Sequence, residues 1–491
     1  MKTSVRSVKF NFVMNSILMA SSFIFPLITF PYISRTLGVN KYGVVTFAQS
    51  TVSYFTMFSS LGIPTYGIRA CTKVRDDKNK LSKTVQELFI INAACTVIVY
   101  IAFFVALFYV ERFKTDSSIL VICSFAIVLN TIGVQWMFSA LEQYSYITKR
   151  NISFKIASIV LMFIFIHDPN DYLIYGVVAL IGTSASNILN FFYTRKFISW
   201  KKKGKYDFRQ HIKPILVFFA TSIAINIYTN LDSVMLGFLS SNMQVGYYAA
   251  AIKLKNVLVS LVRSLGTVLL PRMMYYVGNG LKREYNQTLK KAFNFILVIA
   301  LPMTIFFIMF ANETILFLSG VEYVEATPSM QVLMLTLIFI GLSGTLSDQI
   351  LLPHSNEKQV CIAVSLSAVF DFLLNFVTIP RWGAFGAALS TTLAEFISLV
   401  IQGFYAKSYL KDAFKEINVL PGLVSSALAF VCCFATNKIL KMSVFPTLVA
   451  NAVVFFGVYG ISMYASKDDL VYGMGHVYVD KILTKINWGG K

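Results

Sequence analysis

The stretch QELFIINAACTVIVYIAFFVALFYV occupies residues 86–110 and is apolar over almost its whole length. A helix needs about 20 apolar residues to cross the hydrocarbon layer of a bilayer, and this run is long enough to do so. Comparable runs recur throughout the 491 residues of the chain. The sequence is therefore typical of an all-α, polytopic membrane protein.

Composition agrees with this interpretation. Hydrophobic residues make up 56% of the chain and charged residues 13%, whereas about a quarter of a soluble domain is charged. These values exclude soluble enzymes, DNA-binding modules and secreted disulfide scaffolds. The 6 Cys residues form no C-x-x-C pair, and the 4 His residues are scattered, with no H-E-x-x-H motif and no carboxylate–histidine cluster in the sequence. We therefore expect no metal site.

Windows of about 20 residues predict about 14 transmembrane helices. The predicted spans are residues 10–34, 42–64, 86–110, 118–140, 152–168, 171–194, 213–239, 246–270, 292–311, 328–352, 359–379, 384–406, 417–437 and 445–465.

The distribution of basic residues predicts which connections face the cytoplasm. Most of the 43 Lys and Arg residues fall in alternate connections, at residues 2–9, 69–83, 149–155, 195–213, 272–291, 358, 407–415 and 467–491. The other connections hold only Arg35, Lys41, Arg112, Lys114, Arg381, Lys438 and Lys441. Because cytoplasmic loops carry the excess of Lys and Arg, both termini are predicted to be cytoplasmic.

A weak internal repeat suggests how the spans are grouped. Leu37-Gly38, followed by Tyr42-Gly43, parallels Leu236-Gly237, followed by Gly246-Tyr247-Tyr248. Many transporters consist of two similar halves. We therefore predict an N-terminal six-helix bundle at 1–205, a C-terminal six-helix bundle at 206–411, and two further helices with a cytoplasmic tail at 412–491. Chance recurrence of glycine at helix starts is the alternative.

Three cations fall inside the eighth predicted span, where a buried charge costs about 2.5–3.5 kcal/mol. These are Lys253, Lys255 and Arg263. Asp232, in the seventh span, lies as far from the outer end of its helix as Lys253 does, so an ion pair between the two is expected. Lys255 and Arg263 have no partner of this kind in the sequence, which favours a role in substrate binding.

Other polar residues inside the predicted spans leave two interpretations open. Asp371 and Glu395 lie midway along the eleventh and twelfth spans, and either form a proton or sodium site or make hydrogen bonds between helices. Arg35, near the outer end of the first span, either contacts substrate or extends to the membrane surface. The first half of the chain has no Arg or Lys in the middle of a predicted span, so we expect the positive charge of a substrate site to come mainly from the eighth.

The residues at the two glycine junctions resemble a known family. Asp232-Ser233-Val234-Met235-Leu236-Gly237 with Val245-Gly246-Tyr247-Tyr248-Ala249-Ala250-Ala251-Ile252-Lys253-Leu254 is similar to the signature of bacterial Wzx-type polysaccharide flippases, and Arg35-Thr36-Leu37-Gly38 with Tyr42-Gly43 resembles the matching segment of their first half. These flippases belong to the multidrug/oligosaccharidyl-lipid/polysaccharide exporter superfamily. In span number and motif position the resemblance covers essentially the whole chain.

The resemblance implies two six-helix bundles around a cationic cavity, in the bacterial cytoplasmic membrane. It also implies a function: transfer of an undecaprenyl-diphosphate-linked oligosaccharide of a capsule, exopolysaccharide, O-antigen or teichoic acid from the inner to the outer leaflet by alternating access. The resemblance implies that such a transfer needs no catalytic residues and no cofactor, and proton or sodium coupling is one possible driving force. Polymerases and glycosyltransferases of the same pathway are possible partners, and nucleic acid is not.

Two rival functions are weighed against the flippase. A cation-coupled drug antiporter of the same superfamily is the near rival, although about 12 spans are expected for it. A membrane polysaccharide polymerase or ligase is disfavoured, since such enzymes need a large outer loop bearing His or Arg, and the outer connections here are short.

Overall fold

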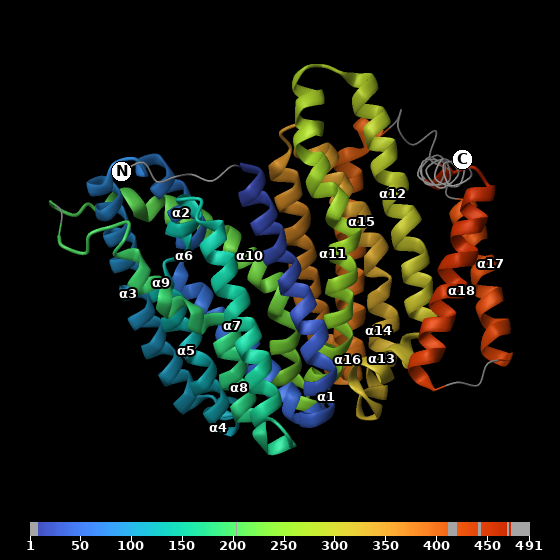
Figure 1. Cartoon of the computed structure of the whole chain (residues 1–491), viewed down its shortest axis with the longest axis horizontal. Coiled ribbons are helices and arrows are strands. Elements are labelled where there is room, and N and C mark those ends of the chain that lie inside the picture. Colours follow the sequence, from blue (N-terminus) through green and yellow to red (C-terminus); the bar gives the residue numbers. More distant parts are fainter. Residues whose placement is uncertain (1–7, 203, 411–419, 440–442, 469–470, 473–491) are drawn as a thin grey trace, which may run out of the picture. The chain divides into compact units, whose positions relative to one another are not determined.

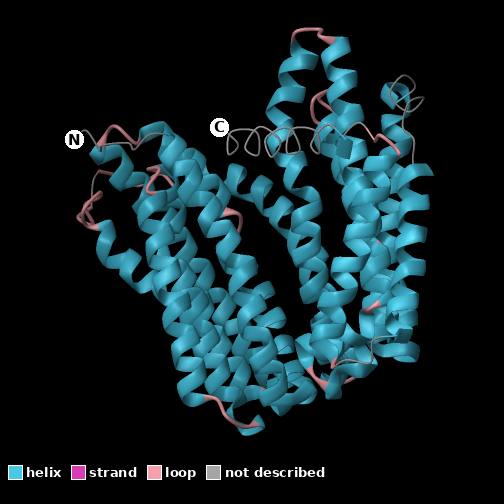
Figure 2. Cartoon of the chain, turned by 45° about the vertical axis from the view of Figure 1, so that its right-hand side comes forward, coloured by secondary structure: helices cyan, strands magenta, loops and turns pink. Residues whose placement is uncertain are grey.

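The computed structural model describes residues 8–202, 204–410, 420–439, 443–468 and 471–472. Within these ranges the chain forms helices and loops and no strand (Figures 1 and 2). Contacts divide it into two compact units, Met1–Gly246 and Tyr247–Lys491. The all-helical class is thus confirmed, whereas the number of membrane crossings, their orientation and the predicted domain limits stay predictions.

The first unit is built around α1, which packs against α3, α5, α7 and α10. Its helices are α1 (Val8–Ser60), α2 (Ile63–Val74), α3 (Lys78–Tyr109), α4 (Glu111–Thr115), α5 (Ser117–Gly133), α6 (Gln135–Ala140), α7 (Tyr144–Phe165), η1 (Pro169–Asp171), α8 (Tyr172–Leu180), the π-helix η2 (Ile181–Ala185), α9 (Ser186–Thr194) and α10 (Arg209–Leu239). The next helix, α11 (Asn242–Gly278), begins at the end of this unit and continues into the second.

In the second unit, α16 packs against α14, α15 and η4. Its helices after α11 are α12 (Lys282–Met309), α13 (Ala311–Ser319), η3 (Val321–Ala326), α14 (Thr327–Met334), α15 (Thr336–Thr345), the π-helix η4 (Leu346–Leu351), α16 (Glu357–Leu410), α17 (Leu420–Ile439) and α18 (Val444–Ala465). The C-terminal pair α17 and α18 packs on α12 through a cluster that includes Phe306, Phe455 and Cys433.

Within the described ranges each predicted span falls on helical residues, but the ends differ; residues 417–419 of the thirteenth span lie outside those ranges. Nine helical segments in the described ranges are long and apolar enough to cross a membrane, among them 13–74 and 357–410. These two segments each cover two predicted spans, because α1 and α16 continue across kinks at Gly38 (φ 70°) and Gly383 (φ 54°). Both kinks lie in the short intervals that separate the predicted spans.

The surface of α3 shows why these helices belong in lipid. Val97, Ile98 and Ile101 are 60–65% exposed, whereas Asn92 and Thr96 are buried. The Asn92 amide donates to the carbonyl of Ser59 at 2.8 Å. A hydrocarbon solvent requires this arrangement, in which apolar side chains face outward and polar side chains are hydrogen-bonded inside.

The connection between α2 and α3 lies outside the apolar segments, and a carboxylate caps the start of α3. Asp77 accepts hydrogen bonds from the backbone N–H groups of Asn79 and Lys80 at 2.9 and 3.1 Å. The bond from Lys80 is the main cause that lowers the pKa of Asp77 below its usual value. This cap separates the amphipathic helix α2 from the long apolar α3.

The repeated glycine motif brings two helix junctions into backbone contact. A Cβ at Gly43 would collide with the carbonyl oxygen of Asn242, and one at Gly246 would collide with that of Val39. Arg112 reinforces the contact, since its Nε donates to the carbonyl of Gly237 at 2.8 Å and its Nη2 to the side-chain oxygen of Asn242. The motif is therefore a packing device, and only glycine fits it.

Gly43→Ala is expected to lower the free energy of unfolding by about 2 kcal/mol or more, because the backbone it would strike has no rotamer with which to move away. Thermal unfolding of the purified protein in detergent measures this. Gly457→Ala is the control, since a Cβ there meets nothing within 4 Å, and it should be neutral or stabilising. Equal midpoints for the two variants would contradict the proposed contact.

Candidate functional site

A cavity of about 480 Å³ lies within the first unit. It is lined by residues of α1, α2, α5, α8, η2 and α10, all of them uncharged among those described. The polar ones are Gln49, Ser53, Thr56, Ser60, Asn130, Thr183, Ser222 and Asn226. Amide and hydroxyl groups beside an apolar wall suit a neutral, hydroxyl-rich ligand.

One wall of this cavity continues into a buried polar chain. Asn130 accepts a hydrogen bond at 3.0 Å from the amide of Asn187, a residue that follows the π-helix η2 and is 5% exposed. The space for Asn187 exists because Gly133 lies against it, where a Cβ would come within 2.5 Å of its Cγ. A π-helix inside an α-helix often marks a functional position.

The three cations of the eighth predicted span all lie on α11. Lys255 is 7% exposed, Lys253 is half-buried, and Arg263 is exposed. Among the described residues, Lys255 Nζ has no hydrogen-bond acceptor and no carboxylate partner. Its Nζ is not among the fully enclosed side-chain atoms that lack a partner, so the ammonium keeps some accessible surface. An unpartnered ammonium inside a predicted membrane span is still costly, so its presence favours a binding role over a structural one.

Arg263 has a partner that the sequence did not reveal. Its Nη2 lies 3.5 Å from Asp348 Oδ2 on the π-helix η4, although the expectation was that no such partner existed. The guanidinium side chain is still 47% exposed, and Gly344 leaves room for it, since a Cβ there would lie 3.3 Å from Nε. A long, half-exposed pair of this kind leaves most of the donors of Arg263 available.

The remaining predicted site residues keep both of their interpretations. Asp232, Asp371 and Glu395 are 6%, 6% and 3% exposed, which is deep for carboxylates. The pairing of Asp232 with Lys253, and the role of Asp371 and Glu395 in ion coupling, stay predictions. Arg35 is exposed and donates to the carbonyl of Pro31 at 2.8 Å.

The first half, for which no Arg or Lys is predicted in the middle of a span, carries two cations on helix α7. Helix α7 begins at Tyr144, earlier than the predicted span 152–168, and so includes Arg150 as well as Lys155, which already lies within that span. Arg150 is 5% exposed, and Lys155 Nζ donates to Ser21 Oγ at 2.9 Å. The charges of this helical turn lower its hydropathy, which is why the apolar window placed the start too late.

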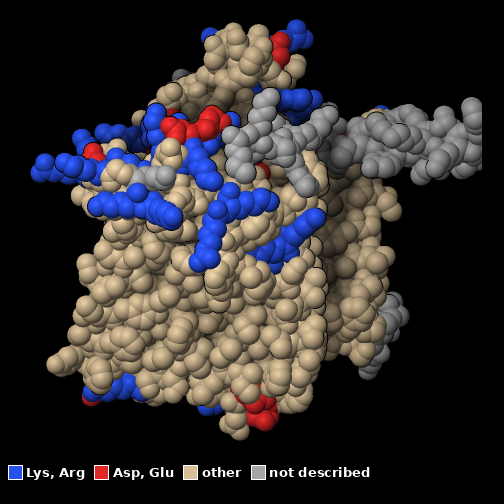
Figure 3. All heavy atoms as spheres, turned by 60° about the vertical axis from the view of Figure 1, so that its left-hand side comes forward, with Lys and Arg blue, Asp and Glu red and all other residues tan. Residues whose placement is uncertain are grey.

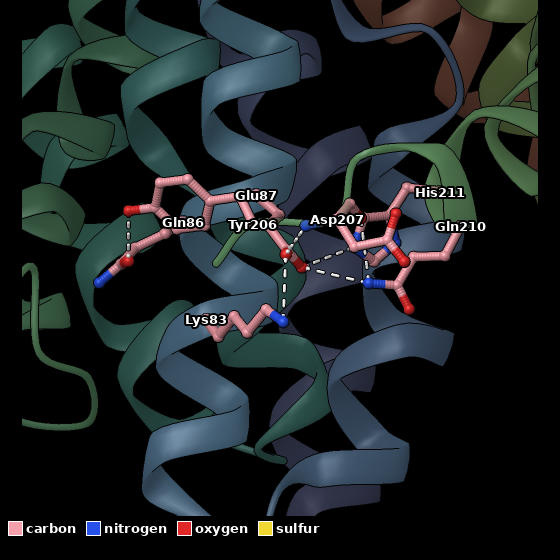
Figure 4. Close-up of polar contacts among 7 residues, drawn as sticks. All are labelled: Lys83, Gln86, Glu87, Tyr206, Asp207, Gln210 and His211. Carbon is pink, nitrogen blue, oxygen red and sulfur yellow. Dashed lines mark hydrogen bonds and ion pairs between the residues drawn. The ribbon is translucent and has the colours of Figure 1, made fainter. Parts of the chain in front are cut away.

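A carboxylate–histidine cluster, which the sequence gave no reason to expect, joins α3 to the start of α10 (Figure 4). Glu87 on α3 is 1% exposed and contacts His211 Nε2 at 3.0 Å, while its Oε1 accepts from the backbone N–H of Asp207 at 2.7 Å. Tyr66 OH lies 2.8 Å from His211 Nδ1. No group of three or more metal-ligating residues occurs in the described ranges. We therefore interpret the cluster as a structural contact that holds the start of α10 against α3.

Basic side chains gather at one end of the first unit. Figure 3 shows them above a broad uncharged band on the displayed face, with few at the other end. The α2–α3 and α9–α10 connections contribute to this end. The asymmetry fits the loop charges from which the cytoplasmic side is predicted.

Comparison with known proteins places the chain in a family. The family model described as "Polysaccharide biosynthesis protein" matches residues 8–277, and the chain belongs to this family. A relative from Escherichia coli (strain K12), named "Putative O-antigen transporter", is 24% identical over 398 residues, which are 80% of this chain and 95% of the relative.

Two solved structures share the fold. One is titled "Lipid II flippase MurJ, inward closed conformation"; it has a TM-score of 0.73 and 18% identity, and the match covers 94% of this chain and all of that one. The other is an inward-facing multidrug resistance MATE family transporter of the MOP superfamily, with a TM-score of 0.60, 14% identity and coverage of 83% and 100%. The chain thus shares its fold with these two membrane proteins.

Lys255→Met is expected to raise the free energy of unfolding by about 1 kcal/mol or more, because it replaces an unpartnered charge inside a predicted membrane span by an apolar side chain of similar length. Thermal unfolding in detergent measures the change, and Lys201→Met at an exposed loop position should shift it by no more than about 0.5 kcal/mol. Destabilisation by Lys255→Met would instead assign this lysine a structural partner.

Glu87→Ala is expected to cost about 3–5 kcal/mol, because it leaves the buried partners of this carboxylate without an acceptor. The matched control is Glu142→Ala. Glu142 pairs with Arg75 at 2.9 Å, but the two side chains are 34% and 37% exposed, so the loss should be at most about 1 kcal/mol. Comparable losses in the same unfolding assay would show that the Glu87 cluster does not hold α10 against α3.

Proposed function

We infer that this protein is a flippase that moves an undecaprenyl-diphosphate-linked oligosaccharide from the inner to the outer leaflet of the bacterial cytoplasmic membrane. The observation that carries the inference is its membership of the polysaccharide biosynthesis family, over more than half of the chain. The relative named as an O-antigen transporter, matched over 95% of its length, supports the same function. So does a fold shared with a lipid II flippase.

The chemistry of the two units fits the two parts of such a cargo. In the first unit, the uncharged cavity offers amide and hydroxyl groups that can bind sugar hydroxyls. In the second, Lys255 and Arg263 offer donors to a diphosphate. We propose Lys253 and Arg35 as secondary contacts. The isoprenoid chain needs no polar site and can stay in lipid.

The transport step needs a driving force. Moving about two negative charges outward against an inside-negative potential of about 100 mV costs about 4.6 kcal/mol. We propose that Asp371 and Glu395, both buried on α16, couple this step to inward movement of protons or sodium ions. Removal of the product by a polymerase of the same pathway is the alternative, and it would make the polymerase and the glycosyltransferases functional partners.

The rival functions have less support. The MATE transporter shares the fold at a lower TM-score and only 14% identity, which carries no argument about cargo. The named relatives are transporters, which disfavours an enzyme such as a polymerase or ligase.

Depletion of the protein in its host tests the proposal. Undecaprenyl-linked oligosaccharide should accumulate in the inner leaflet, and surface polymer should fall. Complementation with Arg263→Ala should restore less than about a tenth of the polymer, because an interaction with a charged group of this kind is worth about 1.5–3 kcal/mol. Leaflet composition is measured with an impermeant reagent that reacts with the sugar.

Two controls accompany this measurement. Lys73→Gln removes an exposed cation of α2 and should complement fully. Asp348→Asn removes the carboxylate beside Arg263 and should retain transport, since the guanidinium stays in place. Unchanged leaflet composition after depletion, together with altered resistance to cationic drugs, would favour the antiporter.

A further inference from the structure

Arg150 is a buried cation without a counter-charge. It is 5% exposed, and within the described ranges no carboxylate contacts it. Its Nη2 donates to two amide oxygens, those of Gln135 at 3.1 Å and Asn151 at 2.9 Å. Its Nε and Nη1 have no hydrogen-bond partner, and its neighbour on the same helical turn is the neutral ring of Tyr146, whose centroid lies 5.8 Å from Cζ. Burying a guanidinium with two unpaired donor nitrogens is costly. An anion bound to these donors would remove that cost.

On one side, the exposed side chain of Gln135 lies between Arg150 and the solvent. Gln135, which accepts from Nη2, is itself exposed. Rotation of that one side chain would therefore open an edge of the guanidinium. A phosphate-type oxyanion could then take two parallel N–H donors, which is the strongest geometry that Arg offers.

The backbone around this site is irregular in two places. Gln135 follows Val134, a buried β-branched residue in the left-handed region at φ 40°, where such residues are strained. The π-helix η2 leads directly into Ser186, whose hydroxyl donates to the Asn151 oxygen at 3.1 Å. Strained and π-helical backbone that converges on one side chain is a mark of a binding site.

The site is also connected to the uncharged cavity. Ser186 is followed by Asn187, whose amide donates to Asn130 in the cavity wall. Arg150, Asn151, Ser186 and Asn187 thus form a polar path from the guanidinium to that wall. A ligand with an anionic group and a neutral sugar would find both kinds of partner in this unit.

The depth of Arg150 suits a lipid headgroup. Helix α7, which carries the fifth predicted span, has 22 residues, so it is about 33 Å long, close to the thickness of the hydrocarbon layer. Arg150 lies in its second turn, about 9 Å from its start. With the orientation that the loop charges predict, this is the inner-leaflet end, where a lipid-borne phosphate would enter.

We propose that Arg150, covered by Gln135, is an oxyanion subsite of the first unit that binds the phosphate groups of the polyprenyl carrier. The identification of the carrier rests on the proposed function, whereas the binding of a phosphate-type anion does not. In the absence of ligand, Gln135 holds the place of one anion oxygen.

Equilibrium binding of radiolabelled pyrophosphate to the full chain in phosphatidylcholine nanodiscs tests the subsite. The background carries Lys255→Met and Arg263→Ala, so that the cations of α11 do not contribute. Saturable binding is expected, and Arg150→Gln should weaken it at least about tenfold. Lys155→Gln, a cation five residues further along α7, is the matched control and should bind like the background protein.

Substitutions at Gln135 make the test independent of how Arg150 affects folding. Gln135→Glu gives the guanidinium a fixed carboxylate and should abolish binding, whereas Gln135→Ala removes the cover and should preserve or strengthen it. If pyrophosphate binding is absent in the background protein, or unaffected by both Arg150→Gln and Gln135→Glu, the subsite is overturned.

The source of the anion is decided by a second probe. Farnesyl diphosphate should bind more tightly than pyrophosphate, and farnesol should not bind. Equal affinity for the two phosphates would support the subsite but assign it to free phosphate. These binding results do not depend on leaflet composition in depleted cells, so the subsite and the proposed function can fail separately.

Discussion

The structure is governed by the absence of water in the bilayer. Every polar group that leaves the membrane surface must find its partner inside the protein, because lipid provides none. Helix α3 meets this requirement with polar residues turned inward, as Asn92 and Thr96 are. Cations that are buried without an acidic partner stand out against this background. Lys255 and Arg150 are of this kind, one in each unit, and both are assigned to anion binding for that reason.

The glycine motif that identifies the family serves the architecture. Gly43 and Gly246 allow the junction within α1 to touch the start of α11 backbone to backbone, and Arg112 ties the end of α10 to the same point. None of these residues belongs to the cavity or to the cation sites. This explains why the motif specifies the class of transporter while carrying no information about the sugar.

Much of the helical fold could be predicted from the sequence, because apolar runs and interrupting polar segments are local signals. The kink at Gly383 and the stop near His167 fall where the spans were predicted to end. The partners within the sites could not be predicted. Asp348 lies 85 residues from Arg263, and Glu87 lies 124 residues from His211, so only tertiary packing brings them together. The apolar windows place Arg150 in a connection between spans, because a turn that contains charged residues has a low mean hydropathy even when it is helical.

The two units contribute complementary chemistry to the proposed transport of a lipid-linked oligosaccharide. An uncharged cavity in one and cations in both match a cargo that joins neutral sugar to diphosphate. The most direct measurement uses the purified protein in proteoliposomes that carry a fluorescent polyprenyl-diphosphate saccharide. The account predicts that the saccharide reaches the opposite leaflet, where an impermeant reagent detects it, much faster than in liposomes without protein. Equal rates with and without protein, under an imposed proton or sodium gradient as well as without one, would contradict it.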